Sequence, residues 1–307
     1  MLKARTAVPT RLMSLLNTLQ FITRHPLNRG HRAESLLRWA RWQVGSRILP
    51  GPVAIPYVND SRLLVAPGMT GATGNIYCGL HEFEDMAFVL HVLRPGDLFV
   101  DVGANIGSYS ILAATTGARC LACEPVPETF QHLLRNIALN GFSAQVDAHN
   151  VAVGASRGRL RFTRDLDTVN HVLAPNESGV ETTEVEVFTL DDLLANDPPA
   201  VIKIDVEGYE TEVIRGSEST LLGASLVAVL MELNGSGARY GYDEQCLVDR
   251  MIDHGFSPCV YSPFDRRLSV LRDRTDNGGN TLFVRNPDVL QKRCETAPLF
   301  RVLGRDL

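Results

Sequence analysis

The stretch from Leu98 to Ser110 carries residue types that could bind a ligand. It reads as an apolar strand that ends at Asp101, followed by a turn with Gly103, Asn105 and Gly107 and then by a helix. Glycine allows positive φ angles and a close approach of the backbone, and asparagine tolerates positive φ better than most residues. The N–H groups at the start of the helix point at the same place. The turn therefore predicts a site for a nucleotide-like ligand.

A second carboxylate, Glu124, ends the next apolar strand, 23 residues after Asp101. In nucleotide-binding α/β folds, an acid about 20 residues beyond the glycine turn accepts hydrogen bonds from ribose hydroxyls. The G-A-N-I-G pattern that begins at Gly103 lacks the middle glycine typical of dinucleotide sites, and Asp101 would pair with an ammonium group but repel a diphosphate. We therefore predict S-adenosylmethionine as the cofactor. A nicotinamide-dependent oxidoreductase on a similar sheet is the alternative.

A third group of charges lies between Lys203 and Glu210. Lys203 and Asp205 share one face of a predicted strand, and a buried lysine needs a carboxylate partner. A buried ion pair that only fixes the strand is one interpretation. The other interpretation is a catalytic role. Glu207 and Glu232 place two more acids near the same strand ends, where carboxylates can serve as a base, hold a hydroxyl or bind Mg²⁺. We predict Asp205 as the base and assign no resident metal.

The elements around these residues alternate between strands and helices, which predicts an α/β fold. We expect a hairpin from 158–162 and 183–188 around a polar insertion, 165–179, in which His171 is a candidate base on a loop above the crevice. The other expected elements are strands at 62–65, 98–102, 119–124, 144–153, 201–205, 226–232, 256–261 and 280–285, and helices at 82–93, 106–116, 128–140, 189–194, 208–215 and 244–254.

The first 50 residues hold nine Lys or Arg and one acid, although the whole chain of 307 residues has a net charge of −5. Helical periodicity at 12–22 and 33–44 predicts two short helices, which either pack on the protein's own body or touch an anionic membrane. We divide the chain into a basic helical extension and linker (1–60), a catalytic domain (61–290) and a C-terminal tail (291–307). No apolar run is long enough to span a bilayer, so we expect a soluble, cytoplasmic protein without a nucleic-acid partner.

The six cysteines do not form a disulfide framework in a chain of this length, and the simplest interpretation is reduced thiols in the core. Cys120 and Cys123 have the spacing of a redox motif or a zinc knuckle. They lie in a predicted strand, however, where residues three apart face opposite sides of the sheet. We therefore expect neither metal binding nor redox chemistry from this pair.

The ordered motifs of the chain resemble those of the FkbM family of S-adenosylmethionine-dependent methyltransferases. The motifs are 99–107, Glu124-Pro125, 150–153, 189–193 and 202–210, and the first 60 residues lie outside the resemblance. It implies a Rossmann-like class I methyltransferase sheet of seven strands, the last one antiparallel, and O-methylation, often of a sugar hydroxyl in a glycan, a lipid-linked saccharide or a natural product. The acceptor would be a saccharide or another small molecule.

The resemblance also implies roles for single residues. Asp101, Gly103, Asn105 and Gly107, with Ala104 in the same turn, would line the methionine part of the cofactor. Glu124 would hold the ribose, Asn150 and Ala152 would lie near the adenine, and Glu82 would reach the cofactor from upstream. The candidate catalytic residues are Lys203, Asp205, Glu207, Glu232 and His171. A protein that keeps the fold and has lost the chemistry remains a further alternative.

Overall fold

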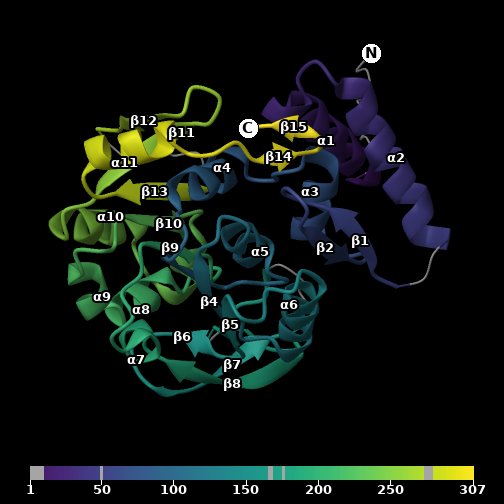
Figure 1. The fold of residues 1–307 in the computed structure, drawn as a ribbon. Helices are drawn as coiled ribbons and strands as arrows, with labels where there is room; N and C mark the ends of the chain where they lie inside the picture. Colours follow the sequence, from purple (N-terminus) through teal and green to yellow (C-terminus); the bar gives the residue numbers. More distant parts are fainter. Residues whose placement is uncertain (1–9, 49–50, 165–168, 175–176, 273–278) are drawn as a thin grey trace, which may run out of the picture.

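A central mixed sheet of eight strands organises the computed structural model, which describes residues 10–48, 51–164, 169–174, 177–272 and 279–307. The strand order is β12-β11-β13-β10-β9-β3-β4-β5 (Figure 1). Neighbouring strands from β10 to β5 run parallel, whereas β13 pairs antiparallel with both β10 and β11. The strands are β3 (Leu98–Val102), β4 (Arg119–Cys123), β5 (Val146–His149), β9 (Val201–Ile204), β10 (Ala228–Glu232), β11 (Ser257–Ser262), β12 (Arg267–Val270) and β13 (Asn280–Val284).

This architecture confirms the predicted Rossmann-like class I sheet, including its antiparallel strand β13. The count of seven strands was one too few. The eighth strand, β12, pairs antiparallel with β11 at the edge, between the expected strands 256–261 and 280–285, where we expected no further strand. Its residues Arg267–Val270 are only partly buried, because an edge strand packs on one side alone, and such a strand leaves little hydrophobic signal in the sequence.

Helices cover both faces of the sheet, and each face has its own apolar core. One core takes side chains from α4 (Phe83–Val92), α5 (Ser108–Ala114) and α6 (Pro127–Leu139). The other takes them from α7 (Leu190–Leu194), α8 (Glu210–Arg215), α9 (Glu218–Leu222) and α10 (Glu244–Asp253). Cys120 packs in the first core and Cys123 in the second, and both thiols are free. The expectation that these two cysteines face opposite sides is confirmed.

The N-terminal segment packs on the body of the protein rather than extending away from it (Figure 1). It consists of α1 (Thr10–Arg24), the 3-10 turn η1 (Pro26–Asn28), α2 (Arg32–Ile48) and α3 (Thr70–Cys78). The buried amide of Asn28 donates to the carbonyls of Ile22 and Tyr77, which joins α1 to α3. The structure therefore shows the self-contact that the sequence left open for this basic segment.

Two expectations about connecting segments were wrong. The segment expected as a linker contains β1 (Val53–Pro56), which pairs antiparallel with β2 (Arg62–Val65). Helix α3 was missed, since its glycines and small residues give little helical periodicity.

The last residues also belong to the folded body. Helix α11 (Pro287–Glu295) packs against α4, and the strands β14 (Arg301–Val302) and β15 (Arg305–Asp306) form a small hairpin. Phe300 and Val302 are buried in the same core as α4. What we expected as a tail from residue 291 therefore contributes to the core.

The expected hairpin beside the main sheet is confirmed. β7 (Gly158–Thr163) pairs antiparallel with β8 (Thr182–Phe188), and β6 (Ala152–Val153) joins them in a three-stranded sheet. The expected strand 144–153 is thus split between two sheets. Of the polar insertion, residues 165–168 and 175–176 lie outside the described residues. Within the part of the chain that the structure describes, no helix is both long and apolar enough to cross a membrane.

Candidate active site

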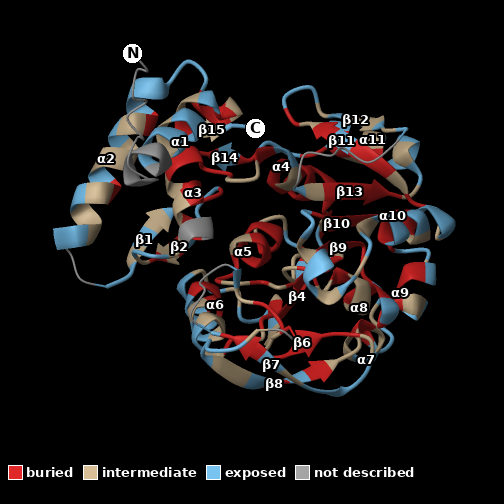
Figure 2. Cartoon of the chain, turned by 180° about the vertical axis from the view of Figure 1, so that it is seen from behind, coloured by how far each residue is buried: buried red, intermediate tan, exposed pale blue. Residues whose placement is uncertain are grey.

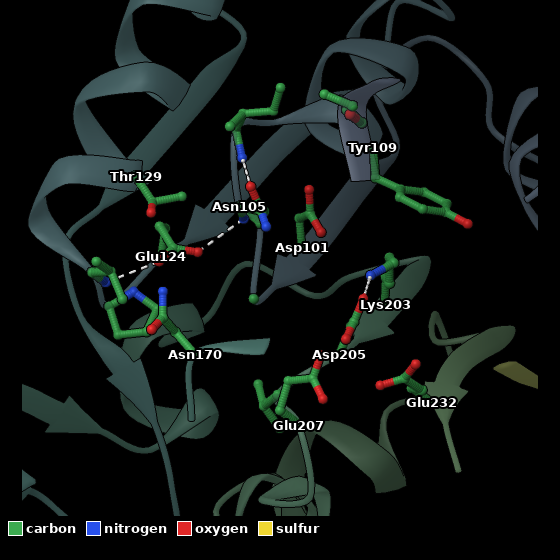
Figure 3. Close-up of a pocket in the computed structure, with 18 of the residues that line it drawn as sticks. Asp101, Asn105, Tyr109, Glu124, Thr129, Asn170, Lys203, Asp205, Glu207 and Glu232 are labelled. Carbon is green, nitrogen blue, oxygen red and sulfur yellow. Dashed lines mark hydrogen bonds and ion pairs between the residues drawn. The ribbon is translucent and has the colours of Figure 1, made fainter. Parts of the chain in front are cut away.

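The carboxyl ends of β3, β4, β9 and β10 meet at one cavity of about 240 Å³ (Figure 3). The register of the strands explains why residues from these strand ends lie close together. Asp101 of β3 lies opposite Lys203 of β9, and Glu124 follows β4 next to them. Parallel strands open their carboxyl ends onto the same crevice, so residues far apart in sequence share one wall. Predicted site residues that line the cavity are Glu82, Asp101, Gly103, Ala104, Asn105, Glu124, Lys203, Asp205, Glu207 and Glu232.

Asp101 is the most buried carboxylate of the cavity, with 1% of its surface exposed. One of its oxygens, Oδ2, accepts a hydrogen bond from the Ser110 hydroxyl at 2.6 Å, while Oδ1 has no hydrogen-bond partner. Burial raises the pKa of Asp101, and the nearby Lys203 ammonium opposes that rise. A buried oxygen without a partner is costly, and a ligand that brings a hydrogen-bond donor or a positive charge would satisfy it.

Glu124 holds the glycine turn in place from the neighbouring strand. Its Oε2 accepts from the backbone N–H of Asn105 and its Oε1 from that of Val126, both at 2.9 Å. Burial raises the pKa of Glu124 to about 7, although these two backbone donors favour the charged form. Each carboxylate oxygen has capacity for a second hydrogen bond, so Glu124 can support the turn and still accept from a ligand hydroxyl.

Both glycines of the turn have the positive φ angles that the sequence predicted, and both are also required for packing. A Cβ on Gly103, whose φ is +82°, would lie 1.9 Å from the carbonyl oxygen of Asp205. A Cβ on Gly107 would lie 2.5 Å from Leu133 Cδ1, and Gly107 does not line the cavity. The turn is therefore locked between β9 and α6, which fixes the position of the donors that it presents.

Three carboxylates converge opposite the turn. One oxygen each of Asp205, Glu207 and Glu232 lies within 4.8 Å of the others, and these atoms could hold a divalent cation. Burial and then the charges of Asp205 and Glu207 raise the pKa of Glu232 to about 9. Glu207 has a pKa raised to about 7, again by burial first and then by Asp205. Like charges this close cannot all ionise at neutral pH, so the group holds at least one proton.

Lys203 lies beside these acids and is almost fully buried. Its ammonium pairs with Asp205 Oδ2 at 2.8 Å and lies over the ring of Tyr109, 4.8 Å from the ring centroid. Burial lowers the pKa of Lys203, but Asp205, Glu82 and Asp101 reverse this effect and leave the pKa raised. The expected ion pair is confirmed, and its charge offsets part of the repulsion among the acids.

His171 does not line the cavity, so its prediction as a candidate base was wrong in geometry. Its Nδ1 lies 2.8 Å from the carbonyl oxygen of Val169 and its Nε2 lies 3.1 Å from the carboxylate of Glu177. Both ring nitrogens thus face acceptors in their own loop. The neighbouring residue Asn170 lines the cavity instead (Figure 3). A loop has no regular alternation of side-chain direction, so the sequence alone does not determine which of two neighbouring residues points inward.

The two residues expected near the adenine also lie outside this cavity. Asn150 is exposed, and its amide donates to the carbonyls of Glu124 and Pro125. Ala152 lines a very small separate hollow that shares Gly103 and Phe162 with the main cavity. Asn150 therefore stabilises the backbone at Glu124 and Pro125.

The methyltransferase FkbM domain family matches residues 101–257 of this chain. The chain belongs to the FkbM methyltransferase family. This assignment confirms the resemblance seen in the sequence and, with it, S-adenosylmethionine as the cofactor of the domain. The matched segment contains every predicted site residue except Glu82.

Two curated relatives are methyltransferases. Hexuronic acid methyltransferase AglP from Haloferax volcanii is 28% identical over 151 residues, which are 48% of this chain and 61% of the relative. The 31-O-demethyl-FK506 methyltransferase FkbM from Streptomyces tacrolimicus is 30% identical over 171 residues, 44% of this chain and 66% of the relative. These alignments thus span less than two thirds of either relative's length.

Among solved structures, precorrin-6y C5,15-methyltransferase from Geobacter metallireducens GS-15 is similar over 72% of this chain and 93% of that chain, with 15% identity and a TM-score of 0.40. A likeness at that level adds nothing to the fold described above.

Sequence reasoning missed Tyr109, which lines the cavity of this FkbM-family chain, and also Asn280 and Asp85, which lie beside the predicted residue Glu82. Glu82 accepts from Tyr109 at 2.7 Å and from the amide of Asn280 at 3.1 Å, and Asn280 also donates to Asp85. Tyr109 is one residue into the helix that follows the glycine turn, so its place on the wall could have been inferred from that turn. Asn280 lies on β13 opposite Glu232, a pairing that only the sheet register determines.

Proposed function

We propose that this protein is an S-adenosylmethionine-dependent O-methyltransferase that acts on a hydroxyl of a saccharide, in a glycan, a glycolipid or a natural product. The observation that carries the proposal is the buried Asp101 oxygen without a partner, which lies in the same cavity as Glu124 and the three converging carboxylates. A negatively charged cavity suits a cofactor that bears a sulfonium and an ammonium group. The relatives support the chemistry, since one is named a hexuronic acid methyltransferase and another a 31-O-demethyl-FK506 methyltransferase.

The residues divide into two groups with different tasks. S-adenosylmethionine supplies a methyl group that is bonded to a positively charged sulfur. The hydroxyl oxygen would bond to the methyl carbon in line with the carbon–sulfur bond, which breaks and releases S-adenosylhomocysteine. Asp101 would hold the ammonium group, and Glu124 would accept from the ribose hydroxyls. Asp205, Glu207 and Glu232 lie across the cavity and would hold the acceptor hydroxyl and take up its proton. Fixing the hydroxyl against the methyl group supplies most of the rate enhancement, up to about 7–11 kcal/mol in favourable cases.

Titration calorimetry with S-adenosylhomocysteine tests the cofactor site. We expect binding to the wild type, and a loss of at least roughly tenfold in affinity for Asp101→Ala and for Glu124→Ala, since each removes a hydrogen bond to a charged group. Asp60→Ala is the control, because Asp60 is an exposed acid on the turn between β1 and β2. Absence of binding to the wild type, or undiminished binding to both site variants, would sink the proposal.

Transfer of a labelled methyl group tests the acceptor class. The protein is incubated with S-adenosylmethionine that carries a labelled methyl group and with a panel of saccharides, and the product is analysed for the methylated atom. We expect label on an oxygen. Label on nitrogen or carbon in every active sample would refute O-methylation while leaving the cofactor assignment intact.

A further inference from the structure

Aromatic rings of α1 and the residue after it form a cluster with rings of the segment that begins α4. Phe21 of α1 contacts the rings of His81 and His25, with centroids 5.2 and 5.7 Å apart, and His25 contacts Phe83 at 5.9 Å. These residues lie outside the segment that matches the family. Phe21 is 39% exposed, although it takes part in this cluster.

The same segment forms a groove of about 440 Å³ that is open to solvent. One side of the groove is α1, and the other is the segment from His81 to Glu84. His81 and Glu82 line both this groove and the cavity with the cofactor residues, so the two hollows share a wall. A molecule held in the groove would therefore lie next to the cavity.

Close packing fixes the imidazole of this shared wall. A Cβ on Gly74 of α3 would lie 2.1 Å from His81 Nδ1, so the helix backbone lies flat against the ring. Nδ1 is buried and has no hydrogen-bond partner, and burial lowers the pKa of His81, so that the ring is neutral at physiological pH. Helix α3 therefore holds the imidazole of His81 in place, and the carboxylate of the shared wall comes from Glu82.

The groove offers the chemistry that a sugar ring requires. Phe21 provides a flat apolar surface for the C–H face of a pyranose, while planar polar groups at the rim can bond to its hydroxyls. These groups are the amides of Asn17 and Gln20 and the guanidinium of Arg24, all on α1.

The charges around the groove argue against an anionic acceptor. Within the groove, Arg24 is outnumbered by Glu82 and Glu84. In the adjoining cavity, six lining carboxylates stand against Lys203, the one lining ammonium or guanidinium group among the described residues. A carboxylate or phosphate on the reacting ring would meet repulsion from both sides.

The geometry points to an acceptor subsite in this groove, which binds an uncharged pyranose ring against Phe21, next to the cavity that His81 and Glu82 also line. This inference rests on the proposed methyl transfer and adds where the acceptor binds and which charge it carries. The N-terminal helix α1 is then a specificity element, because it supplies Phe21 and the three polar groups of the rim.

Saturation-transfer NMR with methyl α-D-glucopyranoside, methyl α-D-mannopyranoside and methyl α-D-glucuronide tests the subsite, with and without S-adenosylhomocysteine. We expect the two neutral glycosides to bind more tightly than the glucuronide. Phe21→Ala should weaken them roughly three- to tenfold, the range for loss of one aromatic contact, and should leave the affinity for S-adenosylhomocysteine unchanged. Leu16→Ala is the matched control, because Leu16 is a 53% exposed apolar residue of the same helix that does not line the groove.

The outcomes separate this inference from the proposed function. Binding of neither neutral glycoside, tighter binding of the glucuronide, or equal binding by wild type and Phe21→Ala would each overturn the subsite. Loss of liposome binding in Phe21→Ala with unchanged glycoside binding would likewise overturn it and assign the ring to a lipid surface. Failure of the wild type to bind S-adenosylhomocysteine would instead refute the cofactor site. The glycoside measurements made without S-adenosylhomocysteine would still show whether the groove binds a pyranose.

Discussion

Replacement of Glu232 by glutamine should stabilise the ligand-free protein at alkaline pH and have little effect at acidic pH. Burial and two neighbouring carboxylates raise the pKa of Glu232 from 4.5 to about 9 in the folded state. Below pH 4.5 the carboxyl is protonated whether the chain is folded or unfolded. Between pH 4.5 and 9 only the unfolded chain releases the proton readily, so the contribution of Glu232 to stability falls as the pH rises.

The size of the effect follows from the width of that window. Each pKa unit corresponds to about 1.4 kcal/mol, which sets an upper bound of about 5 kcal/mol at pH 8. Glu232 keeps some contact with solvent, and Asp205 and Glu207 share the proton, so we expect about 2 kcal/mol. Glutamine has the same shape and no charge at any pH, and it therefore removes this cost.

Urea unfolding of wild type and Glu232→Gln at pH 5 and pH 8 measures the difference. We expect nearly equal free energies of unfolding at pH 5 and a more stable variant at pH 8. Glu128→Gln is the control, because Glu128 is an exposed acid on α6. If the free energy of unfolding of Glu232→Gln, relative to that of the wild type, did not increase between pH 5 and pH 8, the reasoning that the three carboxylates crowd one another would be refuted.

Three further predictions concern the reaction and the fold. Asp205→Asn should lower kcat about 10²–10⁴-fold, since general-base catalysis is lost, and leave the calorimetric affinity for S-adenosylhomocysteine unchanged; full turnover would exclude Asp205 as the base. That affinity should rise between pH 6 and pH 8 in the wild type, because Glu124, with a pKa of about 7, accepts best when ionised; a Glu124→Gln variant with the same pH profile would contradict this. Gly103→Ala should destabilise the fold by about 2 kcal/mol or more in urea unfolding, because its φ is +82° and a Cβ would strike the Asp205 carbonyl; a loss below about 0.5 kcal/mol would show that the turn can relax.

Local patterns in the sequence were sufficient for the elements that are strongly periodic or fully buried. The strands β3, β4 and β9 and the hairpin of β7 and β8 lie where apolar runs and alternation predicted them. Patterns failed where the side chains are small or the strand lies at an edge. Helix α3 and strand β12 were missed for this reason, and the pairing of β1 with β2 was hidden in a proline-rich segment.

The residue types of the site were evident from the sequence, and their arrangement was not. A carboxylate at the end of a buried strand has few explanations, so Asp101, Glu124 and Asp205 could be chosen from strand ends alone. The register of the strands and the course of the loops then determined which residues these side chains contact. They pair Lys203 with Asp205, and they direct Asn170 rather than His171 into the cavity. They also place Glu82 and Tyr109 among the residues that line the cavity.

The sequence by itself determined the order of strands and turns and the kind of cofactor, because those depend on neighbours along the chain. Only the tertiary structure decided that α1, more than 70 residues before the glycine turn, forms a groove next to the cavity. Such a contact depends on how distant segments pack, and no periodicity or motif in the N-terminal residues records which part of the body they will cover.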